Sequence, residues 1–319
     1  MSSFKPVATQ YELVSVLIPL YNHELYIEEC LNSVLAQDRP NIELLLLDDG
    51  SSDKGFDAAC RWRDRHIDCF AKIQFTQQAN AGITHTFDRL IRKSTGRFIV
   101  ILASDDVLLP GSIAQRLELM NNQVVMAVFG DAIPIDNVGK ILGKSAISEL
   151  GQPSSRRALS DPRTLPWELI FRWNIYGSVL LCRRDALLNP DGSSVLNLTV
   201  YSEDMQLYYR LGSEGSLRYL DKPVAKYRIH PANTSRTSAN LNKLRQNIYQ
   251  SRRHSLGGMP WLRRIVVSLQ AFTYYRWREG LWARLALPLV ALSYVGILGA
   301  RHFYDIYRTA VLGQVARSE

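Results

Sequence analysis

The first hundred residues alternate between short apolar runs and helical patterns, and this alternation limits the fold more than any other feature. Four runs of strand character, each leading into a polar turn, cover residues 13–20, 42–47, 73–78 and 98–104. Helical patterns fill the intervals between them. A strand, a helix and a strand joined by short loops form a βαβ unit with parallel strands and a right-handed crossover. The sequence therefore predicts an open α/β sheet.

Acidic side chains gather at three loops of this expected sheet. They are Asp48, Asp49 and Asp53 after the second run, Asp105 and Asp106 after the fourth, and Glu203 and Asp204 at the start of a later helical pattern. Loops that follow parallel strands meet at one edge of a sheet, so the three groups are expected to share a cleft. Adjacent carboxylates repel each other and favour a divalent cation between them and a phosphate. Taken alone, each group is also consistent with a turn or a helix cap.

The chain up to about residue 240 continues the α/β pattern. Strands are predicted at residues 124–129, 178–182 and 224–229, helices at 113–120 and 200–211, and loops over 136–165. The four cysteines form no CxxC pair and no metal-binding spacing, which predicts a reducing compartment. The first twelve residues contain no apolar segment typical of a signal peptide. A cytoplasmic location is expected.

Residues 241–319 differ in charge and aromatic content. They hold twelve Lys or Arg, three acidic residues and eleven aromatic residues, a charge of +9, whereas residues 1–240 are nearly neutral. The apolar run at 285–300 is interrupted by Pro288 and falls short of the about twenty residues that a membrane span needs. Helices lying on an anionic membrane surface are the preferred interpretation. Packing on the core or a homo-oligomer contact is the alternative; no nucleic-acid motif is present, so nucleic acid is not an expected partner.

Six motifs in this order resemble those of bacterial family 2 glycosyltransferases with the GT-A fold. The N-terminal ones are VSVLIPLYNHELYIEECLNSVLAQ, IELLLLDDGSSD, QANAGIT and GRFIVILASDD, and the later ones are YSEDMQL and KYRIHPANTSR. The resemblance covers residues 13–236, and the ordered combination is more specific than any single motif. It implies a GT-A domain at 1–240, with a nucleotide-sugar half at 13–110 and an acceptor half at 111–240. The tail at 241–319 lies outside it.

The resemblance also implies roles for individual residues on the donor side. The nucleotide-sugar-binding positions are Pro19, Tyr21 and Glu24 at the uridine pocket, Asp48 with Asp49 at the uracil or ribose, Asn80 and Gly82 at the wall, and His230 and Asn233 over the phosphates. By the same likeness Asp105, assisted by Asp106, holds Mg²⁺ or Mn²⁺. Asp204 is the expected general base, with Glu203 beside it.

Two positions depart from the family pattern. Ala103 stands where many relatives carry the first carboxylate of a DxD motif, which bears on the metal site. Residues 86–88 read Thr-Phe-Asp where relatives often have an Arg-Asn pair.

The function that the resemblance implies is a metal-dependent, inverting transfer from a nucleotide-sugar, most simply a UDP-sugar. The expected acceptor is a polyprenyl-diphosphate-linked glycan at the inner face of the cell membrane, as in O-antigen, capsule or exopolysaccharide assembly. A non-catalytic sugar-nucleotide-binding module is one alternative. A nucleotidyltransferase is another, although its usual glycine-rich phosphate loop is absent from VLIPLYNHE.

Overall fold

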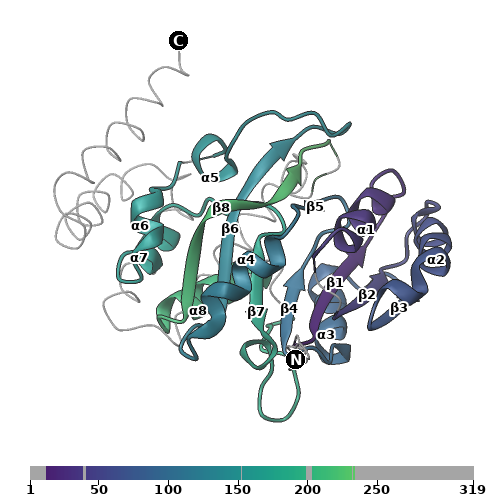
Figure 1. Cartoon of the computed structure of the whole chain (residues 1–319), viewed down its shortest axis with the longest axis horizontal. Helices are drawn as coiled ribbons and strands as arrows, with labels where there is room; N and C mark the ends of the chain where they lie inside the picture. The colour runs from purple at the N-terminus through teal and green to yellow at the C-terminus, as the bar shows by residue number, and fades with distance from the viewer. Residues whose placement is uncertain (1–11, 39–40, 152, 199–202, 232, 234–319) are drawn as a thin grey trace, which may run out of the picture.

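The computed structural model shows one mixed sheet with helices on both faces (Figure 1). It describes residues 12–38, 41–151, 153–198, 203–231 and 233. The predictions made for residues 241–319 lie outside these ranges. Within them, no helix is long and apolar enough to cross a membrane.

Eight strands of the described chain form the sheet in the order β3-β2-β1-β4-β7-β6-β8-β5. Their bounds are β1 Val14–Leu20, β2 Ile42–Asp48, β3 Lys72–Gln77, β4 Phe98–Ile101, β5 Val107–Leu108, β6 Ala127–Ile135, β7 Leu180–Arg183 and β8 Leu217–Arg228. Strands β3, β2, β1 and β4 are parallel to one another. Strand β7 is antiparallel to both β4 and β6, and β8 is parallel to β6. Consequently β4, β6 and β8 point the same way.

The strand order reverses beside β1, which makes a topological switch point between β1 and β4, and three N-terminal helices connect these strands. They are α1 Ile27–Leu35, α2 Gly55–His66 and α3 Ile83–Lys93. Helices α1 and α2 pack on each other. The chain steps from β1 outward to β2 and β3 and then returns to β4 on the other side of β1, so right-handed crossovers put α3 on the opposite face. Ligands of such sheets bind outside the carboxyl ends of the strands where the order reverses, here between β1 and β4.

The second half of the domain adds shorter helices and one long strand. The helices are α4 Ser112–Glu118, α5 Ala146–Glu149, α6 Arg156–Ser160, α7 Leu165–Phe171 and α8 Glu203–Ser213, with 3₁₀ turns at Ile67–Cys69, Leu119–Asn121 and Arg184–Leu187. Helices α7 and α8 pack on each other, and α8 also contacts β8. A turn of three residues separates α8 from β8. Because this connection is so short, α8 runs back along β8, and its N-terminal end points toward the carboxyl edge of the sheet.

The structure confirms the α/β architecture and corrects several boundaries. The fourth strand ends at Ile101 rather than at Ser104, because Ala103 donates its N–H to the Ser178 hydroxyl (2.7 Å) instead of continuing the ladder. The strand predicted at 124–129 starts at Ala127 and continues to Ile135. The strand predicted at 224–229 starts seven residues earlier.

The segment expected to be loops also contains regular structure. Two short helices, α5 and α6, lie within residues 136–165. Each begins behind a serine whose hydroxyl accepts a backbone N–H, Ser145 for α5 and Ser155 for α6. Side-chain caps of this kind satisfy backbone groups that a short helix leaves unpaired. Helix α7 was not predicted.

Gly130 should be intolerant of a side chain. A Cβ at this bulged position of β6 would lie 2.6 Å from a methyl carbon of Val224 and 2.8 Å from the carbonyl oxygen of Lys222. We expect Gly130→Ala to lower the free energy of unfolding by about 1–3 kcal/mol, measured by urea denaturation. At Gly212 the nearest atom to a new Cβ is 3.5 Å away, so Gly212→Ala should leave stability equal or raise it by up to about 1 kcal/mol. Equal changes in the free energy of unfolding for Gly130→Ala and Gly212→Ala would contradict the close approach of β8 to Gly130.

Candidate active site

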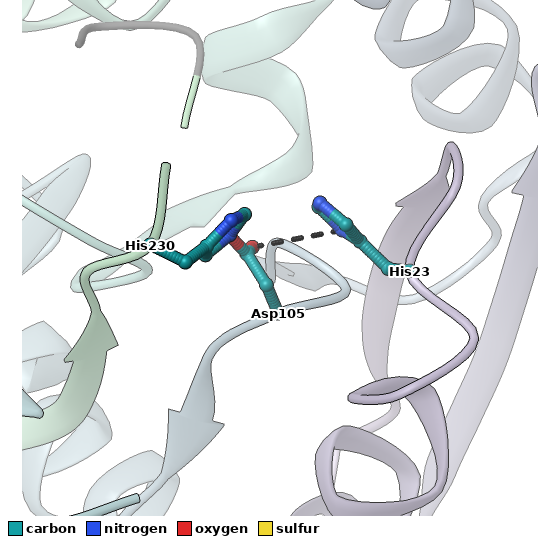
Figure 2. A group of neighbouring side chains, drawn as sticks. All are labelled: His23, Asp105 and His230. Atoms are coloured by element: carbon teal, nitrogen blue, oxygen red, sulfur yellow. Dashed lines mark hydrogen bonds and ion pairs between the residues drawn. The ribbon is translucent and has the colours of Figure 1, made fainter. Parts of the chain in front are cut away.

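Three side chains from distant parts of the chain meet at the switch point. His23 lies in the loop after β1, Asp105 in the loop after β4, and His230 just beyond β8 (Figure 2). The Nε2 atom of His230 is 3.0 Å from Asp105 Oδ2, and the Nδ1 atom of His23 is 3.9 Å from Asp105 Oδ1. One nitrogen or oxygen atom from each residue lies within 4.8 Å of the others. Among the residues that the structure describes, this is the one group of three His, Cys, Asp or Glu side chains with metal-ligand spacing.

The charge states of this cluster suit a cation. Burial lowers the pKa of His23, and the nearby Asp105 carboxylate only partly opposes this effect. Burial raises the pKa of Asp105, but the hydrogen bond from His230 and the charges of the two imidazoles outweigh it, so the pKa lies below its usual range. At neutral pH the cluster therefore offers a carboxylate and a neutral His23 ring, the forms that bind metals.

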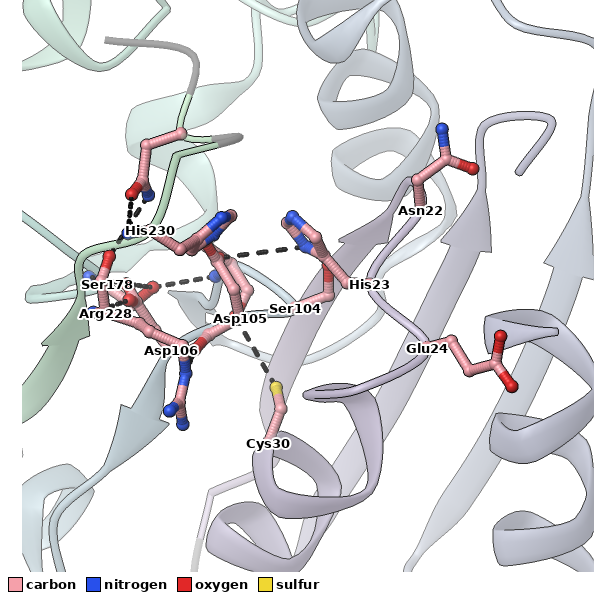
Figure 3. A network of polar contacts seen from close by, with 12 residues as sticks. Asn22, His23, Glu24, Cys30, Ser104, Asp105, Asp106, Ser178, Arg228 and His230 are labelled. Carbon is pink, nitrogen blue, oxygen red and sulfur yellow. Dashed lines mark hydrogen bonds and ion pairs between the residues drawn. The ribbon is translucent and has the colours of Figure 1, made fainter. Parts of the chain in front are cut away.

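Three hydrogen bonds from neighbouring residues hold the Asp106 side chain in place. Its Oδ1 accepts the backbone N–H of Arg228 (3.0 Å), and its Oδ2 accepts the backbone N–H and the hydroxyl of Ser178 at 3.0 and 2.8 Å (Figure 3). Burial and the adjacent Asp105 raise the pKa of the Asp106 carboxyl to about 8. Asp106 was predicted to assist as a metal ligand, but it lies outside the His23–Asp105–His230 group.

Arg228 ties the end of β8 to α1 and to the acidic loop. Its Nε donates to the backbone carbonyl of Asp105 (2.8 Å), and its guanidinium pairs with Glu29 of α1. The same guanidinium lies 4.8 Å from the ring centre of Tyr26. These contacts fix the backbone immediately before His230.

Asn233 closes the turn that carries His230. Its Oδ1 accepts the backbone N–H of His230, and its Nδ2 donates to the carbonyl of Arg228 at 3.1 Å. His230 is thus buried and oriented by its own loop. The predicted place of both residues over the donor phosphates stays a prediction.

The two carboxylates after β2 differ in their contacts. Asp48 is fully buried and accepts hydrogen bonds from the N–H and hydroxyl of Ser51 and from Gln77. Asp49 accepts the backbone N–H groups of Ala81 (2.8 Å) and Gly82 (2.9 Å). Asp48 therefore shapes its own turn, whereas Asp49 anchors the loop that precedes α3.

The other predicted donor residues lie on loops at the same edge, with one exception. Pro19 is buried inside β1, opposite Leu47 of β2. Tyr21 is 49% exposed. Asn80 is exposed, and Gly82 has a φ of 89°, with open space where a side chain would begin.

Residues 22–24 are bonded to residues 51–54 across the two loops. The side-chain oxygen of Asn22 accepts the N–H of Ser52 (2.8 Å), and Glu24 accepts the N–H of Lys54 (3.1 Å). In return Glu24 donates its own N–H to Asp53 (2.8 Å). Glu24 points away from Asp105 (Figure 3). The loops after β1 and β2 are thus joined to each other and lie on one side of the switch point between β1 and β4.

Asp204 lies on the first turn of α8 and its side chain is exposed. Glu203 is the first residue of α8.

Sequence reasoning missed three residues that build the site: His23, Ser178 and Arg228. His23 was placed in a polar turn without a role. The signal that was available for it is the YNHE turn, which follows β1 at the edge where ligands bind. Ser178 carried no local signal, because its partner Asp106 lies 72 residues away in the sequence. Arg228 belongs to the KYRIHPANTSR motif, but its bond to Asp106 joins residues more than a hundred positions apart.

Comparison with known proteins identifies the family. The family Glycosyl transferase family 2 matches residues 15–180, about half of the chain. The chain belongs to glycosyltransferase family 2. The matched residues include the loops after β1, β2 and β4 described above.

Curated relatives are about a quarter identical to the chain over the aligned residues. An uncharacterized glycosyltransferase of Rickettsia conorii is 26% identical over 269 residues, 79% of this chain and 40% of the relative. One of Nostoc is 26% identical over 227 residues, 71% of this chain and 67% of the relative. The chain thus spans less than half the length of the Rickettsia relative.

Solved structures show the same fold. S. aureus TarS 1–349 in complex with UDP has a TM-score of 0.59 at 16% identity, covering 83% of this chain and 72% of TarS. The mannosyltransferase PcManGT of Pyrobaculum calidifontis, in complex with GDP-Man and Mn²⁺, has a TM-score of 0.59 at 18% identity, covering 96% of this chain and 81% of that one. These likenesses confirm the GT-A fold predicted from the sequence.

Asp106 should act on stability through its three donors. In Asp106→Asn the amide NH₂ replaces one acceptor oxygen and faces a buried N–H, so we expect the free energy of unfolding to fall by about 1–3 kcal/mol. Urea denaturation measures it. The matched control is Asp64→Asn, which breaks an exposed ion pair with Arg63 and should cost less than about 1 kcal/mol. An Asp106→Asn protein as stable as the control would show that these hydrogen bonds contribute little.

Proposed function

We propose that the chain transfers a sugar, with inversion, from a nucleotide-activated donor to an acceptor hydroxyl, using a divalent cation bound at Asp105 and His230. The observation that carries this proposal is the Asp105–His230 contact at the switch point between β1 and β4. Buried carboxylate and imidazole groups at this edge can hold Mg²⁺ or Mn²⁺ against a diphosphate. Both ligand side chains are nearly closed to solvent, with exposures of 10% and 4%.

The donor nucleoside would bind on the side of the loops after β1 and β2. Those loops are bonded to each other through Asn22, Ser52 and Glu24, so their shape exists before a ligand arrives. The exposed ring of Tyr21 offers a stacking surface for a base. A uridine nucleotide is the simplest candidate, because TarS, which has the same fold, was solved with UDP. PcManGT was solved with GDP-Man, so a guanosine donor is the alternative.

The bound cation would supply charge that neutralises the leaving diphosphate. Asp105 and His230 would hold it, and the Asp106 hydrogen bonds would keep the Asp105 loop in place. The acceptor oxygen attacks the anomeric carbon while the bond from that carbon to the diphosphate oxygen breaks. The nucleoside diphosphate leaves with the bonding electrons, and Asp204 takes the proton of the acceptor hydroxyl. Glu203 would lie beside this base.

The acceptor would be a polyprenyl-diphosphate-linked glycan on the inner face of the membrane. The support is compositional: residues 241–319 carry +9 and eleven aromatic residues, a combination that favours an anionic lipid surface. Assembly of bacterial surface polysaccharide is the process that such a reaction would serve. Contact between two copies through the tail is a further expectation.

Donor turnover tests the proposed function. A panel of UDP-, GDP- and dTDP-sugars is incubated with Mn²⁺ or Mg²⁺, and release of the nucleoside diphosphate is measured. We expect one donor to be hydrolysed, with activity lost on chelation and lowered at least a hundredfold in Asp105→Ala, since the cation loses its carboxylate. Asp204→Asn should lower the transfer rate to an added acceptor while leaving the donor dissociation constant within about threefold.

Two other results would redirect the proposal. UDP binding without turnover of any donor, in the presence of lipid-linked acceptors, would favour a non-catalytic binding module. Release of pyrophosphate from a nucleoside triphosphate would favour a nucleotidyltransferase. Asp64→Asn, which alters an exposed ion pair on α2, serves as the control for purification and folding.

Removal of residues 256–319 tests the membrane proposal. We expect the full chain to sediment with vesicles containing anionic lipid, and to be released as salt is raised, because exposed charges are screened. The truncated protein should stay in the supernatant and still bind the donor. Sedimentation of the truncated protein with the same vesicles would contradict a membrane role of the tail.

A further inference from the structure

The His23 ring contacts the loop after β4, in which Ala103 stands where the family pattern has a carboxylate. Ala103 brings only a methyl group to the loop after β4, so the first acid of the DxD pattern is missing. The His23 ring approaches Asp105 from the turn after β1, on the other side of Asp105 from His230 (Figure 2). Its Nδ1 lies 2.8 Å from Ser104 Oγ and 3.9 Å from Asp105 Oδ1.

We propose that His23 is a third protein ligand of the metal site, so that two imidazoles and one carboxylate select Mn²⁺ and related transition ions over Mg²⁺. This inference rests on the proposed function, since it concerns the cation of the same site. It assigns to His23 the position that the missing carboxylate would otherwise fill. The set of ligands is His23, Asp105 and His230.

The geometry is close to what three ligands of one ion require. Bonds from such ions to nitrogen and oxygen are about 2.0–2.2 Å long, so two ligand atoms lie at most about 4.4 Å apart. The ligand atoms of the three residues lie within 4.8 Å of one another. A shift of a few tenths of an ångström brings them to this spacing. The two imidazole rings meet edge to face with their centres 5.5 Å apart, so neither ring covers the other's nitrogen atoms.

The surrounding contacts hold the His23 ring in this place. Ser104 contacts its Nδ1, and the Tyr26 ring packs on its edge with centres 5.9 Å apart. Its side chain is 20% exposed, so an ion can reach it from solvent. On the backbone side, Asn22 has a φ of 55° and is fixed by its bond to Ser52. These contacts orient the ring, and an ion bound at Nδ1 would take the place of the Ser104 contact.

The composition of the ligand set determines the preference. Mg²⁺ binds oxygen ligands and keeps its water, whereas imidazole is a ligand of transition ions, and the affinity of such sites rises from Mn²⁺ toward Co²⁺ and Zn²⁺. A carboxylate at position 103 would favour Mg²⁺; an imidazole at position 23 shifts the balance to transition ions. The missing carboxylate at position 103 and the imidazole at position 23 therefore shift the ion preference in the same direction, away from Mg²⁺.

The competing explanation is that His23 only positions the Asp105 loop through Ser104. Two variants separate the explanations. His23→Asn keeps a polar atom near the place of Nδ1 and so can retain the contact with Ser104, but it removes the imidazole. Ser104→Ala removes the contact and keeps the imidazole.

The experiment is a metal titration of the full chain without donor. Free Mn²⁺ is followed by electron paramagnetic resonance, and Mg²⁺ by competition. We expect the wild type to bind Mn²⁺ at least tenfold more tightly than Mg²⁺. His23→Ala and His23→Asn should weaken Mn²⁺ binding on the order of 10–100-fold, while Ser104→Ala changes it by less than about threefold. His23→Asp should raise the affinity for Mg²⁺ relative to Mn²⁺.

Pulsed resonance of the bound Mn²⁺ gives a direct readout of the ligands. Two coordinated imidazole nitrogens are expected in the wild type and one in His23→Asn. Equal Mn²⁺ affinity and an unchanged nitrogen count in His23→Asn would overturn the inference. So would a loss in Ser104→Ala as large as that in His23→Asn.

The outcome is separable from that of the proposed function. If donor turnover is present but His23→Asn binds Mn²⁺ as the wild type does, the third ligand is refuted and the transferase stands. If Mn²⁺ binding depends on His23 but no donor is turned over, the metal site stands and the transferase is refuted. Circular dichroism during thermal unfolding checks that each variant is folded.

Discussion

The site depends on how the chain holds two neighbouring carboxylates, Asp105 and Asp106, below the surface. Two such charges side by side in a protein interior are unfavourable unless each has partners or a proton. The chain treats them differently. Asp106 receives three hydrogen bonds from β8 and from the segment before β7, while Asp105 turns toward two imidazoles (Figure 3). One carboxylate thus anchors the loop, which leaves the other for chemistry.

Arg228 couples the two halves of the domain through this loop. It stands at the end of β8, in the second half of the domain, and yet its guanidinium pairs with Glu29 of α1 and lies against the Tyr26 ring. Its N–H and its Nε bond to Asp106 and to the Asp105 carbonyl. Because His230 follows two residues later, the position of its imidazole is set by contacts with the N-terminal half. The group of His23, Asp105 and His230 is therefore completed only when β8 has docked.

Local patterns in the sequence were sufficient for the N-terminal half of the fold and insufficient for the rest. Strands β1, β2 and β4 are mostly apolar runs because both faces are covered, and such runs are recognisable without partners. Strand β8 begins with Leu217 and Arg218 in a stretch of mixed polarity, and it is a strand only because β6 pairs with it. Helix α7 was overlooked for a similar reason, since it is stabilised by packing on α8.

For the candidate site, too, some features were predictable from the sequence and others were not. Asp105 and His230 were predicted because their motifs occur in order, but the contact between them joins residues 125 positions apart. The roles of the paired acids were less accessible. Nothing in the run DDGSSD distinguishes Asp48, which closes its own turn, from Asp49, which holds the loop at Gly82. Similarly, DD at 105–106 does not reveal which carboxylate is tied down, because the donors that decide it come from Ser178 and Arg228.

The turn after β1 contacts both the loop after β2 and the loop after β4. Asn22 adopts a left-handed conformation that costs energy for a residue with a side chain, and its bond to Ser52 offsets that cost. Glu24, two residues on, bonds to the same partner loop, and His23 between them projects to the other side, toward Asp105 (Figure 3). The wall proposed for the nucleoside and the imidazole proposed for the metal thus come from adjacent residues of one rigid turn. Their relative position is set during folding, so a donor that contacts both would bind without paying to order this turn.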